Sequence, residues 1–232
     1  MDEMKAMWPD FVAKTKAGTD GTLYYGFAVC DNQVFTREGF KDAAGLLAHM
    51  SDVEETMKKT IEVVGGTTAL ELKVVGPKAE LDKLREALTP LGCKFFETDP
   101  GPGATCFRSG VAGKPDAHVT VVPFFTVQDG KMDDFKKCLA DLLKATEGGT
   151  KECLYYGFHI CGNEVYCREG YESASGALAH LGDVDAPLNA ALSMASVDLS
   201  VMGPAAELEK LKEAMAPLGT KFYALDEGAF WK

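Results

Sequence analysis

Two segments of this chain repeat each other, and this duplication constrains the fold more than any other feature. Residues 23–49 and 154–180 are identical at 16 of 27 positions when the sequence is shifted by 131 residues. Residues 75–96 and 202–223 agree at 14 of 22 positions at a shift of 127 residues. Similarity of this extent indicates two copies of one structural unit. We therefore expect two modules of the same fold in tandem.

The second copy predicts alternating strands and helices. Residues 118–127 are rich in β-branched and aromatic side chains, which is typical of a strand. Residues 131–146 carry apolar side chains at helical spacing. The other predicted elements are strands 153–161 and 164–169 joined at Gly162-Asn163, a helix 173–191 that could break near Pro187, a strand 197–202, a helix 204–215 and a strand 221–225. This order is close to a ferredoxin-like unit with an extra helix and strand, so we predict an α+β fold.

The first copy is incomplete at its beginning. Met1 aligns with Met132, so residues 1–232 contain no counterpart of the strand 118–127. We expect a truncated or processed form that lacks an N-terminal piece, in preference to a module that manages without its edge strand. Residues 99–116 are rich in glycine and proline and read as a linker. The predicted modules are therefore residues 1–98 and residues 117–232.

Composition excludes several classes of function. The formal net charge is −11 and there is no basic run, which opposes binding to nucleic acid or to an anionic membrane. No stretch approaches the ~18 apolar residues of a membrane-spanning helix. The seven cysteines are odd in number and form no C-x-x-C pair, which favours a reducing intracellular compartment over a disulfide framework. We expect no metal site, and no nucleotide-binding or serine-nucleophile motif is present.

Three short motifs recur in the same order in both copies: Arg-Glu-Gly, Ala-His and Gly-Pro-x-x-Glu-Leu. Together they resemble antibiotic-biosynthesis-monooxygenase (ABM) domains, which belong to the dimeric α+β barrel superfamily. The resemblance covers both modules. It implies modules that pair sheet to sheet, each sheltering a pocket between its sheet and its helices. We expect the two modules to pair within the chain as a single-chain pseudo-dimer, the alternative being a homo-oligomer in which each module pairs with a second chain.

The resemblance also implies a range of activities. The family includes cofactor-independent oxygenases, haem-degrading enzymes, isomerases and members without assigned chemistry. The first hypothesis for this chain is a cofactor-independent monooxygenase-like protein that acts on a small aromatic or otherwise hydrophobic molecule. The second is a non-catalytic module of the same fold that binds a ligand or serves as an interaction surface. Neither hypothesis calls for a cofactor.

His159 is the candidate catalytic base. Strand alternation places it on one face of residues 153–161 together with Tyr155, and the first copy has Ala28 at the equivalent position. If that face lines a pocket, the imidazole could accept a proton near neutral pH. The alternative is a histidine packed at an interface with both ring nitrogens satisfied.

Six further residues are candidate ligand contacts, three from each copy. They are Tyr24 and Tyr155, His49 and His180, and Arg37 and Arg168. The histidines close equivalent helices, where they could instead cap free carbonyls. The arginines could clamp a polar group or pair with charges across the hairpin. The tyrosines could stack on an aromatic ligand or simply pack.

Overall fold

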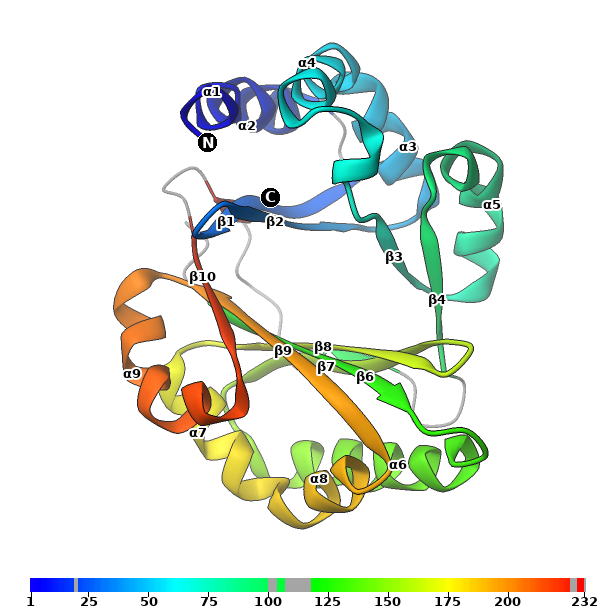
Figure 1. Ribbon diagram of the computed structural model, residues 1–232, viewed down its shortest axis with the longest axis vertical. Coiled ribbons are helices and arrows are strands. Elements are labelled where there is room, and N and C mark those ends of the chain that lie inside the picture. The colour runs from blue at the N-terminus through cyan, green and yellow to red at the C-terminus, as the bar shows by residue number, and fades with distance from the viewer. Residues whose placement is uncertain (19–20, 100–103, 107–117, 226–228, 232) are drawn as a thin grey trace. The chain divides into compact units, whose positions relative to one another are not determined.

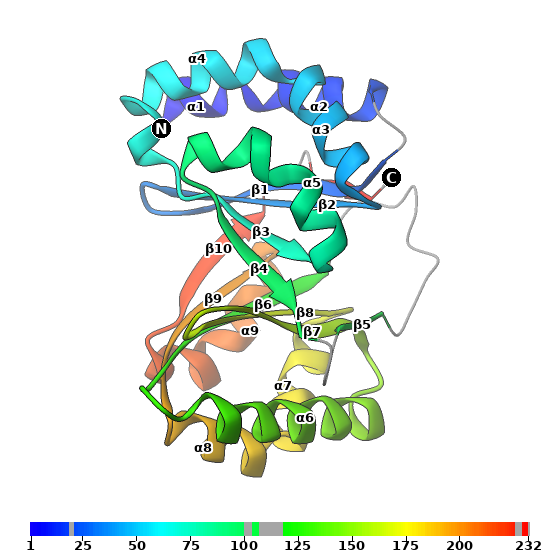
Figure 2. The same ribbon diagram turned by 90° about the vertical axis from the view of Figure 1, so that its right-hand side faces the viewer.

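The computed structural model describes residues 1–18, 21–99, 104–106, 118–225 and 229–231. The chain divides into two compact units (Figures 1 and 2). Unit 1 comprises Met1–Phe95, Val111–Asp116 and Leu225–Lys232, and unit 2 comprises Phe96–Gly110 and Ala117–Ala224. Each unit is therefore built mostly from one repeat and receives a segment from the other.

Unit 2 follows the predicted order of elements. Its strands are β5 (Ala104–Cys106), β6 (Val119–Val127), β7 (Cys153–Cys161), β8 (Glu164–Tyr171), β9 (Ala195–Gly203) and β10 (Lys221–Leu225). Its helices are α6 (Met132–Gly149), α7 (Ala174–Asp183), α8 (Asp185–Leu192), α9 (Ala205–Met215) and the 3-10 turn η3 (Ala216–Leu218). The helices α6, α7 and α8 lie along one face of the sheet (Figure 2), which is the face that a two-layer α+β unit must bury.

The strand β6 is the centre of this sheet. It pairs antiparallel with β8 on one side and with β9 on the other. The expectation that this strand is an edge strand is therefore wrong. β7 and β8 form a hairpin, and β8 pairs with one side of β6. The chain then continues through α7 and α8 and returns as β9, which pairs with the other side of β6.

The predicted helix over residues 173–191 is two helices. The first, α7, ends at Asp183, and α8 begins at Asp185, so only Val184 separates them. Pro187 does not cause this break, because it lies in the first turn of α8, where a missing N–H costs nothing. One continuous apolar core joins the sheet and the helices of unit 2, and it includes Phe125, Phe135 and Phe158.

Unit 1 repeats this arrangement with fewer strands. Its elements are α1 (Asp2–Lys5), α2 (Trp8–Ala17), β1 (Thr22–Cys30), β2 (Gln33–Phe40), α3 (Ala43–Asp52), α4 (Glu54–Val64), η1 (Thr67–Ala69), β3 (Lys73–Gly76), α5 (Lys78–Leu88), η2 (Thr89–Leu91), β4 (Lys94–Thr98, which runs into unit 2) and β11 (Phe230–Trp231). The hairpin β1–β2 corresponds to β7–β8, and β3 corresponds to β9. In the part of the chain that the structure describes, nothing corresponds to β6.

The core of unit 1 shows the effect of this difference. The buried residues of α2 and β1, among them Trp8 and Phe27, form one cluster. The buried residues of α3 and α5, among them Leu84 and Leu88, form another. In unit 2 the equivalent residues belong to a single cluster that also contains β6. Trp8 stands where unit 2 has Leu139, and its indole stacks on Phe27 with ring centroids 4.9 Å apart.

Two short strands near the ends of the repeats are exchanged. The strand β11 follows the second repeat and pairs with β1 of the first. The strand β5 follows the first repeat and pairs with β7 of the second. The predicted linker 99–116 thus contains a strand, while most of it lies outside the described residues. The module boundaries at residues 98 and 117, and the pairing of the modules, stay predictions.

Two further findings concern the chain as a whole. No helix among the described residues is long and apolar enough to cross a membrane. No disulfide joins the cysteines whose side chains the structure describes.

Candidate active site

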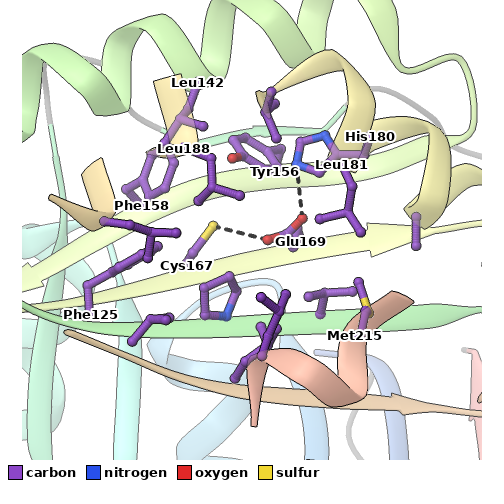
Figure 3. Close-up of a pocket in the computed structure, with 18 of the residues that line it drawn as sticks. Phe125, Leu142, Tyr156, Phe158, Cys167, Glu169, His180, Leu181, Leu188 and Met215 are labelled. Carbon is purple, nitrogen blue, oxygen red and sulfur yellow. Dashed lines mark hydrogen bonds and ion pairs between the residues drawn. The ribbon is translucent and has the colours of Figure 1, made fainter. Parts of the chain in front are cut away.

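A cavity of about 110 Å³ lies in unit 2 between the sheet and the helices (Figure 3). Its walls are apolar side chains from β6 to β9 and from α6 to α9. Leu218 of η3 lines the cavity and is 48% exposed, so the cavity reaches solvent beside this residue. Five lining side chains can gain or lose a proton: Tyr156, Cys167, Glu169, Tyr171 and His180. The lining contains no lysine or arginine.

Strand alternation places three of these groups side by side. Cys167, Glu169 and Tyr171 occupy every second position of β8, so they point to the helix-covered face. Glu169 lies opposite Tyr156 of β7 and opposite Val121 of β6. Its carboxyl group is therefore held between two paired strands, and only 5% of its side chain is exposed.

The Glu169 carboxylate has three polar neighbours. The Tyr171 hydroxyl donates a hydrogen bond to Oε2. The Cys167 thiol donates to Oε1 at 3.7 Å, and His180 Nε2 lies 3.4 Å from Oε2 (Figure 3). The imidazole contact is longer than an ordinary hydrogen bond, which is common in ligand-free catalytic sites. The carboxyl group and the imidazole thus face each other at the wall of the cavity.

A second set of contacts fixes the tautomer of His180. The Thr150 hydroxyl donates its proton to Asp183 Oδ2 at 2.8 Å, and its oxygen lies 3.3 Å from His180 Nδ1. Because the only hydroxyl proton of Thr150 is already donated to Asp183, this oxygen accepts a hydrogen bond from His180 Nδ1–H. The lone pair of a neutral His180 is then on Nε2, directed toward Glu169. The ring is held between Tyr156 and Tyr171, with both centroid distances 5.2 Å.

Burial sets the charge of this pair. It raises the pKa of Glu169 to about 7, against the opposing hydrogen bonds from Tyr171 and Cys167. It lowers the pKa of His180 to about 4, against the opposing charge of Asp183. It also holds the pKa of the Cys167 thiol well above its usual range, so that this thiol stays protonated. Near neutral pH the imidazole is therefore neutral and the carboxyl group is poised between its two forms.

This arrangement suits proton transfer to or from a small apolar molecule. A carboxyl group with a pKa near the working pH is an efficient general base or acid. The neutral imidazole offers an acceptor nitrogen beside it. The walls would exclude water from a bound molecule and would strengthen electrostatic interactions at the pair.

Unit 1 contains the same pair in an open setting. Glu38 Oε2 lies 3.5 Å from His49 Nε2, and the imidazole again lies between two aromatic rings, those of Tyr25 and Phe40. The Glu38 side chain, however, is 36% exposed, against 5% for Glu169. The wall that β6 supplies in unit 2 has no counterpart in the described part of unit 1.

The predicted site residues separate into two groups. His180 lines the cavity of unit 2, and His49 occupies the equivalent place in unit 1. His159 lies on β7 among residues that face away from the cavity. It is 1% exposed, its Nδ1 lies 3.1 Å from Thr98 Oγ1, and its Nε2 has no hydrogen-bond partner. Burial, with the charge of Arg168, lowers the pKa of His159 to about 3.

The predicted tyrosines and arginines also lie away from the cavity. The Tyr155 ring crosses Gly170, and its hydroxyl group lies 2.9 Å from Thr120 Oγ1 and 3.0 Å from His118 Nε2. The Arg168 guanidinium lies 5.4 Å from the centre of the Tyr155 ring. Tyr24 and Arg37 hold the equivalent positions in unit 1, where the Tyr24 ring crosses Gly39. A functional role for these residues and for His159 stays a prediction.

Glu169 is not among the site residues that the sequence predicts. The Arg-Glu-Gly motif points to Arg168, and the sequence shows no partner for the glutamate. A signal was nevertheless present, because alternation along β8 puts Glu169 on the same face as Val165 and Cys167. A carboxylate on an otherwise apolar strand face must be paired or neutralised when that face is buried.

No cluster of ligands able to hold a metal ion occurs among the described residues.

Comparisons with solved structures place this fold among known ones. A "putative monooxygenase" from Lactobacillus acidophilus is 13% identical, covers 82% of this chain and 84% of its own, and has a TM-score of 0.51. A "putative monooxygenase" from Fusobacterium nucleatum is 13% identical, covers 86% of this chain and 83% of its own, and has a TM-score of 0.53. The chain shares the α+β fold of these proteins. Each of these two structures covers more than half of the chain and therefore reaches both repeats.

One further structure is more similar in sequence over a shorter length. MupZ from Pseudomonas fluorescens is 31% identical over 48% of this chain and 92% of its own, with a TM-score of 0.46. Comparison with family models gives no match, and comparison with curated proteins gives none either. The α+β fold is thus shared with solved structures, and these likenesses do not identify a reaction.

Proposed function

We propose that unit 2 is a cofactor-independent, monooxygenase-type enzyme that acts on a small, uncharged, hydrophobic molecule. The observation that carries this proposal is the single carboxyl–imidazole pair, Glu169 and His180, at the wall of an otherwise apolar cavity. The fold shared with two "putative monooxygenase" structures supports the reaction class when it is taken together with this pair. The fold alone does not identify a reaction, because one fold hosts many reactions.

The cavity suggests the size and charge of the substrate. Its volume of about 110 Å³ is somewhat smaller than the apolar cavity of about 150 Å³ that holds benzene in an engineered protein. A single ring would fill it, and a longer molecule would extend past Leu218 toward solvent. Because the lining has no cation, a carboxylate or phosphate group inside the cavity would have no counter-charge. The buried part of the substrate is therefore neutral.

In the proposed reaction, the Glu169 carboxylate removes a proton from an acidic C–H or O–H group of the substrate. The resulting anion gives one electron to dioxygen, and the two radicals combine to a peroxide. Loss of water from the peroxide converts a CH2 group to a carbonyl, so that CH2 and O2 become C=O and H2O. Tyr171 and Cys167 orient the carboxylate, and His180 accepts a hydrogen bond from the protonated form.

The repeat provides a matched control for the test. We expect Glu169→Gln to abolish oxygen uptake with a panel of small phenols and benzylic ketones, because an amide cannot take up the proton. The equivalent change in unit 1, Glu38→Gln, should leave oxygen uptake unchanged. Uptake is measured with an oxygen electrode, and products by mass spectrometry under ¹⁸O2. Equal activity of Glu169→Gln and the unsubstituted protein would contradict the proposal.

Binding without turnover is the second candidate. The observation that favours it is the recurrence of the pair in unit 1, where Glu38 is partly exposed and the described residues include no counterpart of β6. A pair that is retained without a closed cavity can be structural. Under this alternative, members of the panel bind in unit 2, as measured by calorimetry, but consume no oxygen.

A further inference from the structure

Three rows of side chains line the sheet side of the cavity in unit 2. The members of one row lie next to each other across the strands β7, β8, β6 and β9. The first row is Tyr156, Glu169 and Val121, the second is Phe158, Cys167, Pro123 and Leu199, and the third is Phe125 and Val197. Neighbouring rows are two residues apart along each strand, so the three rows extend over about 13 Å. The cavity therefore follows the direction of the strands.

The ionisable groups of the rows gather at one end. The Glu169 carboxylate belongs to the first row, and His180 Nε2 lies 3.4 Å from it. The second row offers the Cys167 thiol, which already donates to Glu169, and the third row is hydrocarbon. Figure 3 shows Phe125 and Phe158 on one side of Cys167 and the Glu169 and His180 pair on the other. A bound molecule therefore places its polar group at the first row and apolar atoms along the other two.

The cavity meets solvent beside its apolar rows. Leu218 of η3 lines the cavity and is 48% exposed. The turn η3 leads into β10, which runs parallel to β9 and begins with Lys221 beside Ser200. Because Leu218 precedes Lys221, it lies toward the residues that precede Ser200, and these belong to the second and third rows. An apolar chain that starts at Glu169 can therefore run along these rows and reach solvent past Leu218.

The turn that carries Leu218 is held in place. Gly219, directly after it, has a φ of 74°, which glycine adopts without strain. The Gly219 N–H donates to the Ala216 carbonyl at 3.0 Å, and the Thr220 hydroxyl donates to the Met215 carbonyl at 2.6 Å. Met215 is 1% exposed and also lines the cavity. Leu218 is therefore a fixed part of the opening.

We propose that the substrate of unit 2 is an amphiphile whose polar, reacting group lies at Glu169 and whose unbranched alkyl tail leaves the cavity past Leu218. A cavity of about 110 Å³ has room for one ring and none for a second, fused ring. Any part of the substrate beyond a single ring must therefore be narrow. Leu218 is then the residue that sets the specificity for the tail. This inference rests on the function proposed for unit 2, because it takes Glu169 as the reacting end.

The test measures binding of 4-methylphenol, 4-propylphenol and 4-pentylphenol to the full chain by calorimetry. We expect the dissociation constant to fall about two- to fourfold for each added CH2 group, because each one is buried against the apolar rows or Leu218. Leu218→Trp should block the opening and weaken binding of 4-pentylphenol by about tenfold or more. Leu218→Ala removes part of the wall along the tail and should reduce the gain per CH2 group.

The repeat again supplies the control. Leu91 of η2 is the counterpart of Leu218 in unit 1 and is 40% exposed. Leu91→Trp should leave the dissociation constants unchanged. The proposal is overturned if affinity does not depend on tail length, if no member of the series binds, or if the Leu91 and Leu218 variants change the affinities equally.

Oxygen uptake, measured separately with the same series, distinguishes this inference from the reaction on which it rests. Tail-dependent binding that Leu218→Trp abolishes, without oxygen uptake, would support the tail assignment and contradict the proposed reaction. Oxygen uptake with the same KM for all three phenols would support the reaction and overturn the tail assignment.

Discussion

Glu169 is the residue on which the chemistry proposed for unit 2 depends. It is the acidic residue in the lining of the cavity, and it contacts the phenol of Tyr171, the thiol of Cys167 and the imidazole of His180. A carboxylate that is buried away from water must be neutralised by a proton or by neighbouring groups. The neighbours of Glu169 are uncharged near neutral pH, so protonation supplies much of the neutralisation.

The pH dependence of stability tests this view of Glu169. The folded-state pKa of about 7 lies above the ordinary value of 4.5, so the folded protein binds the extra proton between these two pH values. The stabilisation is present below about pH 4.5 and is lost as the pH rises to about 7. We therefore expect the unfolding free energy of the unsubstituted protein, relative to Glu169→Gln, to fall by about 1–3 kcal/mol across this range.

Urea unfolding over a series of pH values measures this difference. His180 has a lowered pKa and acts in the opposite direction, but it is present in both proteins and its contribution largely cancels. Burial also raises the pKa of Glu38 to about 7, so Glu38→Gln should give a change of the same sign. Because the Glu38 side chain is 36% exposed, we expect this change to be smaller than that of Glu169→Gln. A difference that stays constant from about pH 4.5 to about pH 7.5 would show that Glu169 is not neutralised by burial.

At the scale of elements, the Gly-Pro-x-x-Glu-Leu motif has a structural role. Glu207 of α9 accepts a hydrogen bond from the backbone N–H of Ala174, in the first turn of α7, at 2.9 Å. Glu80 of α5 does the same for Ala43 of α3 at 3.0 Å. In both units the motif thus caps the helix that carries the histidine of the pair, and a carboxylate also suits the positive end of that helix.

Glu207→Ala should therefore remove a hydrogen bond from the first turn of α7 and destabilise the fold. We expect a loss of about 1 kcal/mol in the free energy of unfolding, which is the usual cost of removing a helix cap. The exposed Glu209 of the same helix, which pairs with Lys212, is the matched control. Glu209→Ala should change stability by less than about 0.5 kcal/mol. Chemical denaturation measures both, and equal effects would refute the capping role.

At the scale of the whole molecule, the exchanged strands tie the repeats into units that cross the repeat boundary. Unit 2 includes Thr98, which lies 3.1 Å from the imidazole of His159, and β5, which pairs with β7. The backbone N–H of Asp99 also donates to the carbonyl of Phe158. The second repeat alone therefore lacks the segments of the first repeat that pair with β7.

A comparison of two fragments tests this exchange. We expect residues 96–232 to be more stable to urea than residues 117–232 by about 2 kcal/mol or more, because the shorter fragment loses several hydrogen bonds and leaves buried polar groups of β7 unsatisfied. Circular dichroism during urea titration measures the difference. Equal stability would mean that the second repeat is a complete unit and that the boundary predicted at residue 117 is sufficient.

The sequence by itself determined the duplication, the α+β class and most element boundaries, because these depend on local periodicity and on turn residues. The hairpins and the helix that ends at Met215 follow directly from strand alternation and helical spacing. His180 was also found this way, since its place near a helix end recurs in the other repeat. Each of these features is contained in a short stretch of chain.

The tertiary structure alone decided which face of each strand meets the helices and which residues far apart in sequence meet. Alternation separates Glu169 from Arg168 but does not say which of them is buried. It was the packing of α7 on β8 that brought His180 to Glu169 and left His159 on the opposite face. The central place of β6 and the exchange of β5 likewise depend on long-range backbone pairing, which no local pattern encodes.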